Sequence, residues 1–587
     1  MLVHNLKRTL KDWDESVEWQ TPTDTKHGLL TTSAAFIRAK NEGKNPTEIA
    51  TDLNTNLISY LNTKMPEFTS VTIGPYINIV LNNVGFQKIL ESAPELFVEQ
   101  DERNVMYEYL GLNVAKRPHL GHLRNMIIGD ALRCLLALKY PNMTTDHHWG
   151  DWGVQFGILL WAFKENVDQE AYEQDPIEEL SRLYVWGNAQ KEITPDWDLL
   201  VRQEFIALEA GDETRKKLWE EWVRISQESI QQEFDIWNIP DTDLHQGESY
   251  YEPVMKELTA YLDANDIWEK DGDARYFEFE TIADSWPDLS QEDAARIKNY
   301  GRAYCISSNG YTTYVYRDIA TRLQWARDYK TDLAITVTGS EQQHNFNQAF
   351  SAIAYLATRD DFSTLFGEHT ASRLTLSSLI HVPYGFLTLT SGKMSTREGN
   401  VILIPDIRAQ TKDAVIQSLS ERESRISTDD EQAIDTLVMA SLKWSEVSRD
   451  RLTDVVMDPQ KAVQFEGNTG IYQLYSYARI AGIVRELGSA PERGDAETLS
   501  DEEKQILQQL LETSTVIEQS IATYKPNILS EHVYNLNQSM NTWYANTSVK
   551  NEANETRRAT LLRLCELFCQ VQKQSLQLLG IDVLEQM

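Results

Sequence analysis

Cysteine is scarce in this sequence. The 587 residues contain four cysteines, at Cys134, Cys305, Cys565 and Cys569, and their spacing fits neither a zinc-ligand pattern nor a disulfide framework. The last two are one helical turn apart, which is typical of small buried side chains on a helix. We therefore predict no zinc site and no other metal site.

Long apolar runs are absent as well. No stretch reaches the roughly 18 apolar residues that a membrane-spanning helix needs, and residues 1–20 lack the apolar core of a secretory signal. The composition, 41% hydrophobic and 25% charged, is typical of a globular protein. We expect a cytoplasmic protein with no membrane partner.

Basic residues are few relative to acidic ones. Lysine and arginine number 55 against 89 aspartates and glutamates, a net charge of −34, which argues against extensive contact with phosphates. Residues 113–139 are an exception, because this segment contains five basic residues and only one acidic residue, Asp130. The local excess of positive charge could hold an anion. These five are Lys116, Arg117, Arg124, Arg133 and Lys139.

The chain is too long for one hydrophobic core, since cores stop growing near roughly 250 to 300 residues. Residues 1–98 show helical periodicity that breaks at Gly43 and Pro46, followed by a strand-like, turn-punctuated stretch at 71–82. We predict an α+β domain over these residues.

The pattern changes at Val105. Three short strand candidates separated by long helical stretches favour a parallel α/β sheet. An acidic, Trp-rich region near 162–300 predicts a helical insertion. The predicted fold is a multidomain α/β protein with a Rossmann-like parallel-sheet core at 99–405 and an all-helical domain at 406–587. The strand candidates are residues 105–110, 333–339 and 379–389.

The first candidate site is residues 113–132, NVAKRPHLGHLRNMIIGDAL. Apolar residues at helical spacing predict a helix that begins near His122, after a strand ending near Leu110. The free N–H groups of such a helix suit a phosphate. His119 and His122 can donate hydrogen bonds to oxygens that gain charge in a transition state, and Gly121 allows close approach. Two loop histidines can also occur by coincidence, so this motif needs a second element.

The second candidate is residues 391–400, SGKMSTREGN, which follow a strand-like stretch. Two glycines frame Lys393, Ser395 and Arg397, cations and a hydroxyl suited to closing over a polyphosphate. Alone, this reads as a solvated basic loop. In this order on an α/β frame, the two segments resemble the HIGH and KMSKS signatures of class I aminoacyl-tRNA synthetases.

Several further blocks resemble arginyl-tRNA synthetases, and together they cover nearly the whole chain. NVAKRPHLGHLRNMIIGDALRCLL resembles that family's first signature, HHWGDWGVQFGILL its next block, and GKMSTREGNVILI its variant loop. HGLLTTSAAFIRAKNEGKNPTEIA resembles the family's additional N-terminal domain, which contacts tRNA. EGNTGIYQLYSYARI and LLGIDVLEQM resemble its helical anticodon-binding domain.

The resemblance implies an arginine–tRNA ligase with L-arginine, ATP with Mg²⁺ and tRNA(Arg) as partners. The arginine carboxylate would attack the ATP α-phosphate, and the arginyl group would then pass to the 3′-terminal adenosine, the 2′-hydroxyl first. Activation would depend on tRNA, and the protein would be a monomer. Positioning and charge neutralisation dominate such phosphoryl chemistry. The implied catalytic residues are Lys116, His119, His122 and Lys393, and the implied ATP-binding residues are Asn113, Gly121, His122, Lys393, Met394 and Ser395.

Arginine recognition needs acids for the guanidinium and polar groups for the amino-acid end. Tyr314 and Asp318 share a face if helical, and the resemblance assigns this pair to the guanidinium. It also implies Glu108, Asn113 and Gln342 as arginine contacts. These residues also have ordinary interpretations: Asp318 could be a solvated acid on a helix, and Tyr314 a half-buried core residue. Glu108 and Gln342 could be polar residues at the ends of loops.

The sequence departs from the family pattern in places. Thr396 replaces the second lysine of KMSKS, and Lys116 occupies the place of an upstream lysine thought to compensate, so we hypothesise that it supplies the missing charge. Residues 111–113 are Gly-Leu-Asn, whereas Ser-Pro-Asn is usual in the family. The sequence therefore keeps the asparagine, Asn113, but lacks the proline. The histidine near Gln342 is shifted, so His344 is left unassigned.

In the last third, Tyr472, Tyr475, Tyr477 and Arg479 could stack on or pair with anticodon bases, although tyrosines there could simply pack between helices. The acidic total predicts tRNA binding confined to a few basic strips and weakened by salt.

Three other functions are considered. A class I synthetase for another amino acid fits Tyr314, Asp318 and the N-terminal block less well. A non-catalytic tRNA-binding paralogue would be expected to lose His119, His122 or Lys393. A small-molecule nucleotidyltransferase would have no evident use for the helical last third.

Overall fold

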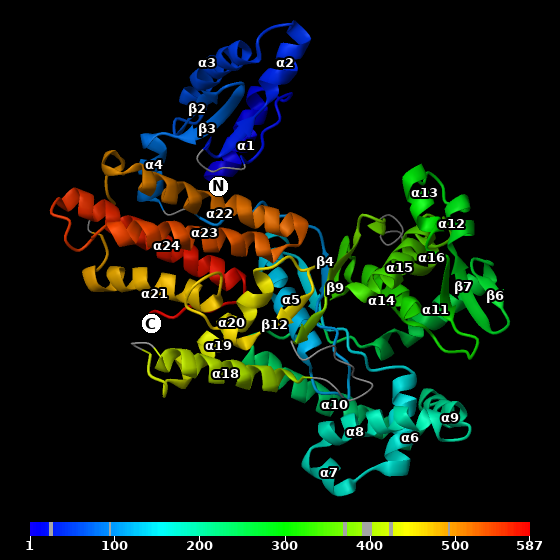
Figure 1. Cartoon of the computed structure of the whole chain (residues 1–587). Helices are drawn as coiled ribbons and strands as arrows, with labels where there is room; N and C mark the ends of the chain where they lie inside the picture. Colours follow the sequence, from blue (N-terminus) through cyan, green and yellow to red (C-terminus); the bar gives the residue numbers. More distant parts are fainter. Residues whose placement is uncertain (23–26, 93–94, 368–372, 390–401, 422–425, 491–492) are drawn as a thin grey trace. The chain divides into compact units, whose positions relative to one another are not determined.

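The structure, a computed structural model, describes residues 1–22, 27–92, 95–367, 373–389, 402–421, 426–490 and 493–587 (Figure 1). It divides into two compact units. One comprises Gln100–Gln410 with Arg449–Pro459, and the other comprises Met1–Glu99, Thr411–Ser448 and Gln460–Met587.

The first unit is built on a parallel sheet in the order β10-β9-β4-β5. Side chains alternate across it: Met106 of β4 joins the core under α14 and α15, while the Tyr107 hydroxyl donates to the Gly129 carbonyl of α5 at 2.7 Å. The parallel α/β core is thus confirmed. The bounds are β4 (Val105–Glu108), β5 (Met143–Asp146), β9 (Leu333–Gly339), β10 (Leu379–Tyr384), α5 (Leu120–Lys139), α14 (Tyr314–Tyr329), α15 (Gln343–Leu356) and α16 (Ser363–Phe366).

The strand order places a switch point between β4 and β9. From β4 the sheet continues to β5 on one side, and from β9 it continues to β10 on the other. In open parallel sheets, ligands bind at the carboxyl ends of the strands at such a point. The sheet therefore directs attention to the residues that follow β4 and β9.

The strand predicted at 379–389 is two strands. The backbone bends at Gly385, whose N–H donates to the Arg451 carbonyl at 2.8 Å. A Cβ at Gly385 would lie 2.7 Å from the Leu452 carbonyl oxygen, so a larger residue would not fit this close approach. After the bend, β11 (Leu387–Leu389) pairs in parallel with β12 (Val455–Met457), a strand that the helical prediction after 405 missed.

The insertion is helical only in part. Its first half is a run of helices that packs α6 against α8 and α9. A three-stranded antiparallel sheet, β6-β7-β8, follows, and the prediction missed it because β6 is short, charged and exposed. The bounds are α6 (Val154–Asn166), α7 (Gln169–Gln174), α8 (Pro176–Ala189), α9 (Trp197–Glu209), α10 (Glu213–Ile236), α11 (Glu252–Ala264), β6 (Glu269–Asp271), β7 (Ala274–Glu278), α12 (Phe279–Ser285), α13 (Gln291–Lys298) and β8 (Arg302–Ile306).

The second unit begins with the predicted α+β segment. Gly43 ends α2 in the left-handed conformation, at φ 66°, and Pro46 opens α3 behind the Asn45 cap. The three strands form an antiparallel sheet in the order β1-β3-β2. The bounds are α1 (Leu2–Trp13), β1 (Leu30–Thr32), α2 (Ala34–Glu42), α3 (Pro46–Lys64), β2 (Phe68–Ile73), β3 (Tyr76–Leu81) and α4 (Asn83–Glu91).

The helices of the last third pack beside one another and share a hydrophobic core with the α+β segment (Figure 1). Leu6 and Leu57 belong to the same buried cluster as Leu507 and Phe568. The two segments, far apart in sequence, thus fold around one core. The bounds are α18 (Ile404–Ser420), in which the unit boundary falls, α19 (Glu431–Val447), α20 (Pro459–Ala462), α21 (Gly470–Leu487), α22 (Asp501–Thr523), α23 (Pro526–Asn546) and α24 (Glu555–Leu578).

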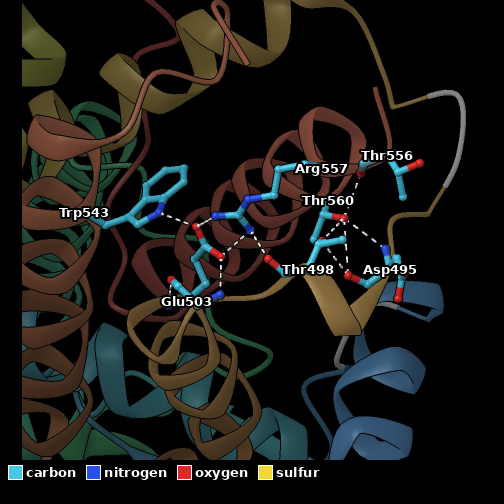
Figure 2. A network of polar contacts seen from close by, with 8 residues as sticks. Asp495, Thr498, Glu503, Trp543, Thr556, Arg557 and Thr560 are labelled. Atoms are coloured by element: carbon cyan, nitrogen blue, oxygen red, sulfur yellow. Dashed lines mark hydrogen bonds and ion pairs between the residues drawn. The ribbon is translucent and has the colours of Figure 1, made fainter. Parts of the chain in front are cut away.

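A buried ion pair joins three of these helices (Figure 2). Glu503 of α22 accepts from both terminal guanidinium nitrogens of Arg557 on α24 and from the Trp543 indole of α23, the latter at 2.9 Å. Its side chain is 1% exposed. Arg557 and the other donors hold the pKa of Glu503 below its usual value although burial opposes this.

Over the part of the chain that the structure describes, no helix combines the length and apolarity needed to cross a membrane.

Candidate active site

The H-x-G-H motif caps a helix with its own side chains. His119 is the N-cap, so α5 begins at Leu120, two residues before the predicted start near His122. The Gly121 N–H donates to His119 Nδ1 at 3.2 Å, and the His119 N–H donates to His122 Nδ1 at 3.2 Å. The two rings stack with centroids 3.8 Å apart. The histidines therefore satisfy the orphan N–H groups of the helix end.

This cap fixes the chemistry of both rings. Because each Nδ1 accepts a hydrogen bond, the proton of each neutral imidazole lies on Nε2. Burial, aided by the charge of Lys116, lowers the pKa of His119 to about 4 and that of His122 well below its usual value. Near neutral pH both rings are uncharged and each carries an Nε2–H donor.

Gly121 also has a structural reason to be small. A Cβ there would lie 3.1 Å from the His119 ring, so the glycine makes room for the folded-back imidazole.

The loop before the motif is held by the helical insertion. Ala115 has a positive φ of 61°, and its N–H donates to Ser226 Oγ of α10 at 2.8 Å. Lys116 Nζ lies 3.9 Å from the centroid of the Tyr184 ring on α8. Asn113 forms a bridge with Gly150 and has an exposed side chain. The insertion thus sets the conformation of the residues predicted to meet ATP.

The second motif, residues 391–400, lies outside the described residues, but the residues that follow it from 402 onward are described. The Leu120 N–H donates to the Ile402 carbonyl at 2.9 Å, and the Ile404 N–H donates to the Pro118 carbonyl at 3.2 Å. Residues 402–404 therefore pair with the histidine motif. The predicted residues Lys393, Met394 and Ser395, and the departure at Thr396, lie outside the described residues.

The predicted local excess of positive charge is not gathered at one place. Arg124 is buried and donates to three backbone carbonyls, and Arg133 pairs with Asp130. Arg117 pairs with two acids of the insertion. Lys139 ends α5, roughly 30 Å along the helix from the motif. Of the five basic residues, Lys116 is the one whose charge acts on the histidine pair.

Acids gather where the switch point predicts a ligand. Glu108 ends β4, and Asp318 lies on the second turn of α14. Arg322 joins them: its Nη2 lies 2.6 Å from Glu108 Oε2, and its Nη1 lies 2.9 Å from Asp318 Oδ1. The charge of Glu108 acts in turn on Asp146, at the end of β5. This edge of the sheet therefore carries three acids around one arginine.

Tyr314 and Asp318 do share a helix face. Tyr314 opens α14 and is 58% exposed, whereas the Asp318 side chain is 15% exposed. Arg317 lies between them in sequence, with its guanidinium 4.9 Å from the Tyr314 ring and 2.6 Å from Glu248. An open tyrosine above a recessed acid suits a long cationic side chain.

Burial controls the ionisation of these acids. It raises the pKa of Asp318 to about 6 and that of Glu248 to about 7, in each case against the pull of a neighbouring arginine. The pKa of Glu108 is also raised, and that of Asp146 is raised well above its usual value by burial and by Glu108. The arginines are therefore needed to keep negative charge here.

Sequence reasoning missed several members of this cluster. Arg322 follows Asp318 by four residues and so shares its helix face, a signal that could have found it. Glu248, Asp146 and His148 carry no comparable local signal. Gln342, which was predicted, ends the short helix after β9 and is exposed.

A hollow lies within the other unit. It measures about 1120 Å³ and is lined by the predicted residues Tyr472, Tyr475 and Arg479. Arg479 Nη2 donates to the Tyr475 hydroxyl at 2.6 Å, and its guanidinium lies 5.7 Å from the Tyr544 ring. Tyr477 differs: it is 4% exposed, as the packing interpretation expected.

All four cysteines are free thiols, two of them buried. The described part of the chain contains no group of three or more His, Cys, Asp or Glu side chains that could hold a metal ion.

A parallel sheet whose carboxyl edge carries a histidine-capped helix and an acid cluster is the arrangement of a class I aminoacyl-tRNA synthetase, and residues 86–458 match the family described as "tRNA synthetases class I (R), catalytic domain". Residues 1–81 match "Arginyl tRNA synthetase N terminal domain", and residues 473–587 match "DALR anticodon binding domain". The chain belongs to the arginyl-tRNA synthetase family.

Relatives agree over nearly the full length. Arginine–tRNA ligases of Streptococcus pyogenes are 29% identical over 576 residues, covering 97% of this chain and 95% of the relative. The arginyl-tRNA synthetase of Thermus thermophilus superposes with a TM-score of 0.77 at 20% identity, covering 100% of this chain and 99% of that one. That of Plasmodium falciparum gives 0.76 at 19%, covering 100% and 98%. At such identities the structures show the shared fold.

Proposed function

We propose that this chain activates L-arginine with ATP and transfers the arginyl group to the 3′-terminal adenosine of tRNA(Arg). The observation that carries the proposal is the acid cluster of Glu108 and Asp318 at the switch point of the sheet whose α5 bears the histidine cap. Family membership and the relatives' names support it.

In the first step an arginine carboxylate oxygen attacks the α-phosphorus of ATP, and pyrophosphate leaves. The Nε2–H groups of His119 and His122 donate to phosphate oxygens as their charge grows. Lys116 and Lys393 supply positive charge, and Mg²⁺ arrives bound to the phosphates of ATP. Gly121, Met394 and Ser395 complete the proposed ATP site, and Asn113 serves both substrates.

Arginine is held at its two ends. Tyr314 and Asp318 bind the guanidinium, with Glu108 behind them, and Asn113 and Gln342 bind the amino-acid end. In the second step the 2′-hydroxyl of the terminal adenosine attacks the carbonyl carbon of arginyl-adenylate, and AMP leaves.

We further propose three functional domains: 1–98 contacting tRNA, 99–405 catalytic, and 406–587 reading the anticodon. The first presents exposed Phe36, Ile37 and Tyr76, with the Phe36 and Tyr76 rings 5.5 Å apart. In the third, Tyr472, Tyr475 and Arg479 line a hollow suited to stacked bases. The protein would act as a cytoplasmic monomer.

The test is ATP–pyrophosphate exchange over a panel of amino acids, each with and without total tRNA. Exchange with arginine alone, and only when tRNA is present, is the expected result. Exchange with a different amino acid would assign the chain to another substrate. No exchange under any condition would favour a tRNA-binding paralogue.

A further inference from the structure

Arg322 is a fully buried guanidinium at the centre of the acid cluster. Its Nη2 donates to Glu108 at 2.6 Å and to Thr336 Oγ1 at 2.8 Å, and its Nη1 donates to Asp318 at 2.9 Å. The guanidinium also lies between two aromatic rings, 4.8 Å from Trp325 and 5.3 Å from Phe346. Its side chain is 0% exposed. These contacts leave it no route to solvent and no freedom to swing away.

Arg322 thus pairs with Glu108 and Asp318, the acids that the proposed function assigns to binding the guanidinium of the substrate. Arg322 engages Asp318 through Oδ1. Among the described residues, none donates a hydrogen bond to Asp318 Oδ2. A carboxylate can accept several donors at once, so one acid can serve an internal and an incoming guanidinium together.

The surroundings make this internal cation necessary. Glu108 is almost completely buried, and its charge acts on a second buried acid, Asp146. Adjacent buried carboxylates do not stay ionised together without a cation. The other titratable or charged groups that interact electrostatically with Arg322 or Asp318 are Arg317 on the same helix and, on neighbouring elements, His148, Glu248, Tyr251 and His381.

We propose that Arg322 is a positioning residue for the amino-acid substrate: it keeps Glu108 and Asp318 fixed and negatively charged, so that Asp318 Oδ2 and Tyr314 receive the substrate guanidinium. This rests on the proposed function. Arg322 itself does not touch the substrate, because Glu108, Asp318, Thr336 and the two rings enclose it.

The test compares Arg322→Met with the unaltered full chain in tRNA-supplemented pyrophosphate exchange from pH 6.5 to 8.5. Without the cation the acids retain protons to higher pH, so the KM for arginine rises about tenfold at pH 6.5. The rise shrinks toward pH 8.5 as the acids ionise, while kcat at saturating arginine changes little. A residue needed only for folding would not produce this pH-dependent shift in KM.

Further variants separate charge from packing. Arg322→Lys keeps the positive charge but cannot bind Glu108 and Asp318 through two separate nitrogens. The pH dependence of KM should therefore return toward that of the unaltered chain, while part of the increase in KM remains. If Arg322→Met does not fold, Glu108→Gln with Arg322→Met removes the unpaired buried charge, and Asp318 should still give the pH-dependent KM. The matched control is Arg327→Gln, at another arginine of α14, whose pair with Glu257 of α11 is exposed; this variant leaves KM unchanged.

Two results would overturn the inference. An Arg322→Met KM equal to that of the unaltered chain at every pH shows that the acids do not need the cation. A lower KM shows that Arg322 competes with arginine for them. If the unaltered chain activates arginine and either result is found, this inference alone fails, whereas an unaltered chain inactive toward every amino acid refutes the proposed function as well.

Discussion

Lys116 Nζ lies 3.9 Å from the centroid of the Tyr184 ring, so the loop before the histidine pair and the helical insertion meet at a cation–π contact. The same ammonium helps to keep His119 neutral. A single lysine thereby connects the insertion to the cap of α5.

Replacing Lys116 with alanine should lower the rate of arginine activation by tenfold or more, about 1.4 kcal/mol of transition-state stabilisation, because a phosphate-facing charge is lost. Single-turnover formation of adenylate measures this directly. Lys164→Ala, an exposed lysine on α6, serves as the control. An unchanged rate for Lys116→Ala would refute its compensating role.

Tyr184→Leu should have a smaller effect on the same rate. It keeps the lysine and removes only its aromatic support, a contact worth about 0.5 to 2 kcal/mol. A loss as large as that of Lys116→Ala would show instead that the insertion positions the whole loop.

His147→Phe should make the chain less sensitive to acid. The ring is completely buried and stacks on Trp149 at 3.5 Å, and neither of its nitrogens has a hydrogen-bond partner within the described structure. Burial lowers the pKa of His147 well below the usual value. Below about pH 6.5 the imidazole is therefore protonated in the unfolded chain but stays neutral in the folded chain. The free energy of unfolding therefore falls as the pH drops below that point, and phenylalanine removes this loss.

Thermal unfolding at pH 7.5 and pH 5 measures the effect. The two chains should differ little at pH 7.5, and the variant should unfold at the higher temperature at pH 5. His344→Phe, at an exposed position, is the control. A variant with an unchanged response to acid would show that His147 takes up its proton in the folded state.

Breaking the buried pair of Figure 2 should destabilise its unit strongly. Arg557→Met leaves Glu503 buried without its cation and should cost about 3 to 5 kcal/mol in the free energy of unfolding, measured by urea denaturation. Removing both charges, with Glu503→Leu and Arg557→Met, should recover much of the loss. Lys550→Met breaks an exposed pair with Glu486 and should change stability little, because solvent screens surface ion pairs.

The same pair predicts a response to acid of known sign. The pKa of Glu503 is lowered, so its stabilising contribution is present above the carboxyl's ordinary pKa and is lost as the pH falls through the folded-state value. In Glu503→Gln this loss should disappear. Persistence of the full acid sensitivity would assign it to other carboxyls.

Arg479→Gln should weaken tRNA binding about tenfold or more and leave the KM for arginine unchanged, since Arg479 lies in the tyrosine-lined hollow. Filter binding over a salt series measures the affinity. The slope of log affinity against log salt should also decrease, because a cation is lost. Equal binding by the variant would remove this hollow from the tRNA interface.

Much of the fold could be predicted because its signals are local. The apolar periodicity of α5 and the seven-residue run of β9 each report burial along one element, and β9 has the predicted bounds. The turn at Gly43 and Pro46 is set by backbone geometry alone. β6, which is short, charged and exposed, and β12, which is only three residues long, escaped because such short segments leave little pattern in the sequence.

The candidate site divides in the same way. By itself, the sequence determined the order of the two motifs, the helix behind His119 and His122, and the helical pairing of Tyr314 with Asp318, because each depends on spacing within one segment. Only the tertiary structure decided that Arg322 lies against Glu108, 214 residues away in the chain, and that most of the basic residues near the motif pair elsewhere. Such contacts depend on the register of β4 beside β9 and the rotation of α14 over them, which no single stretch of residues specifies.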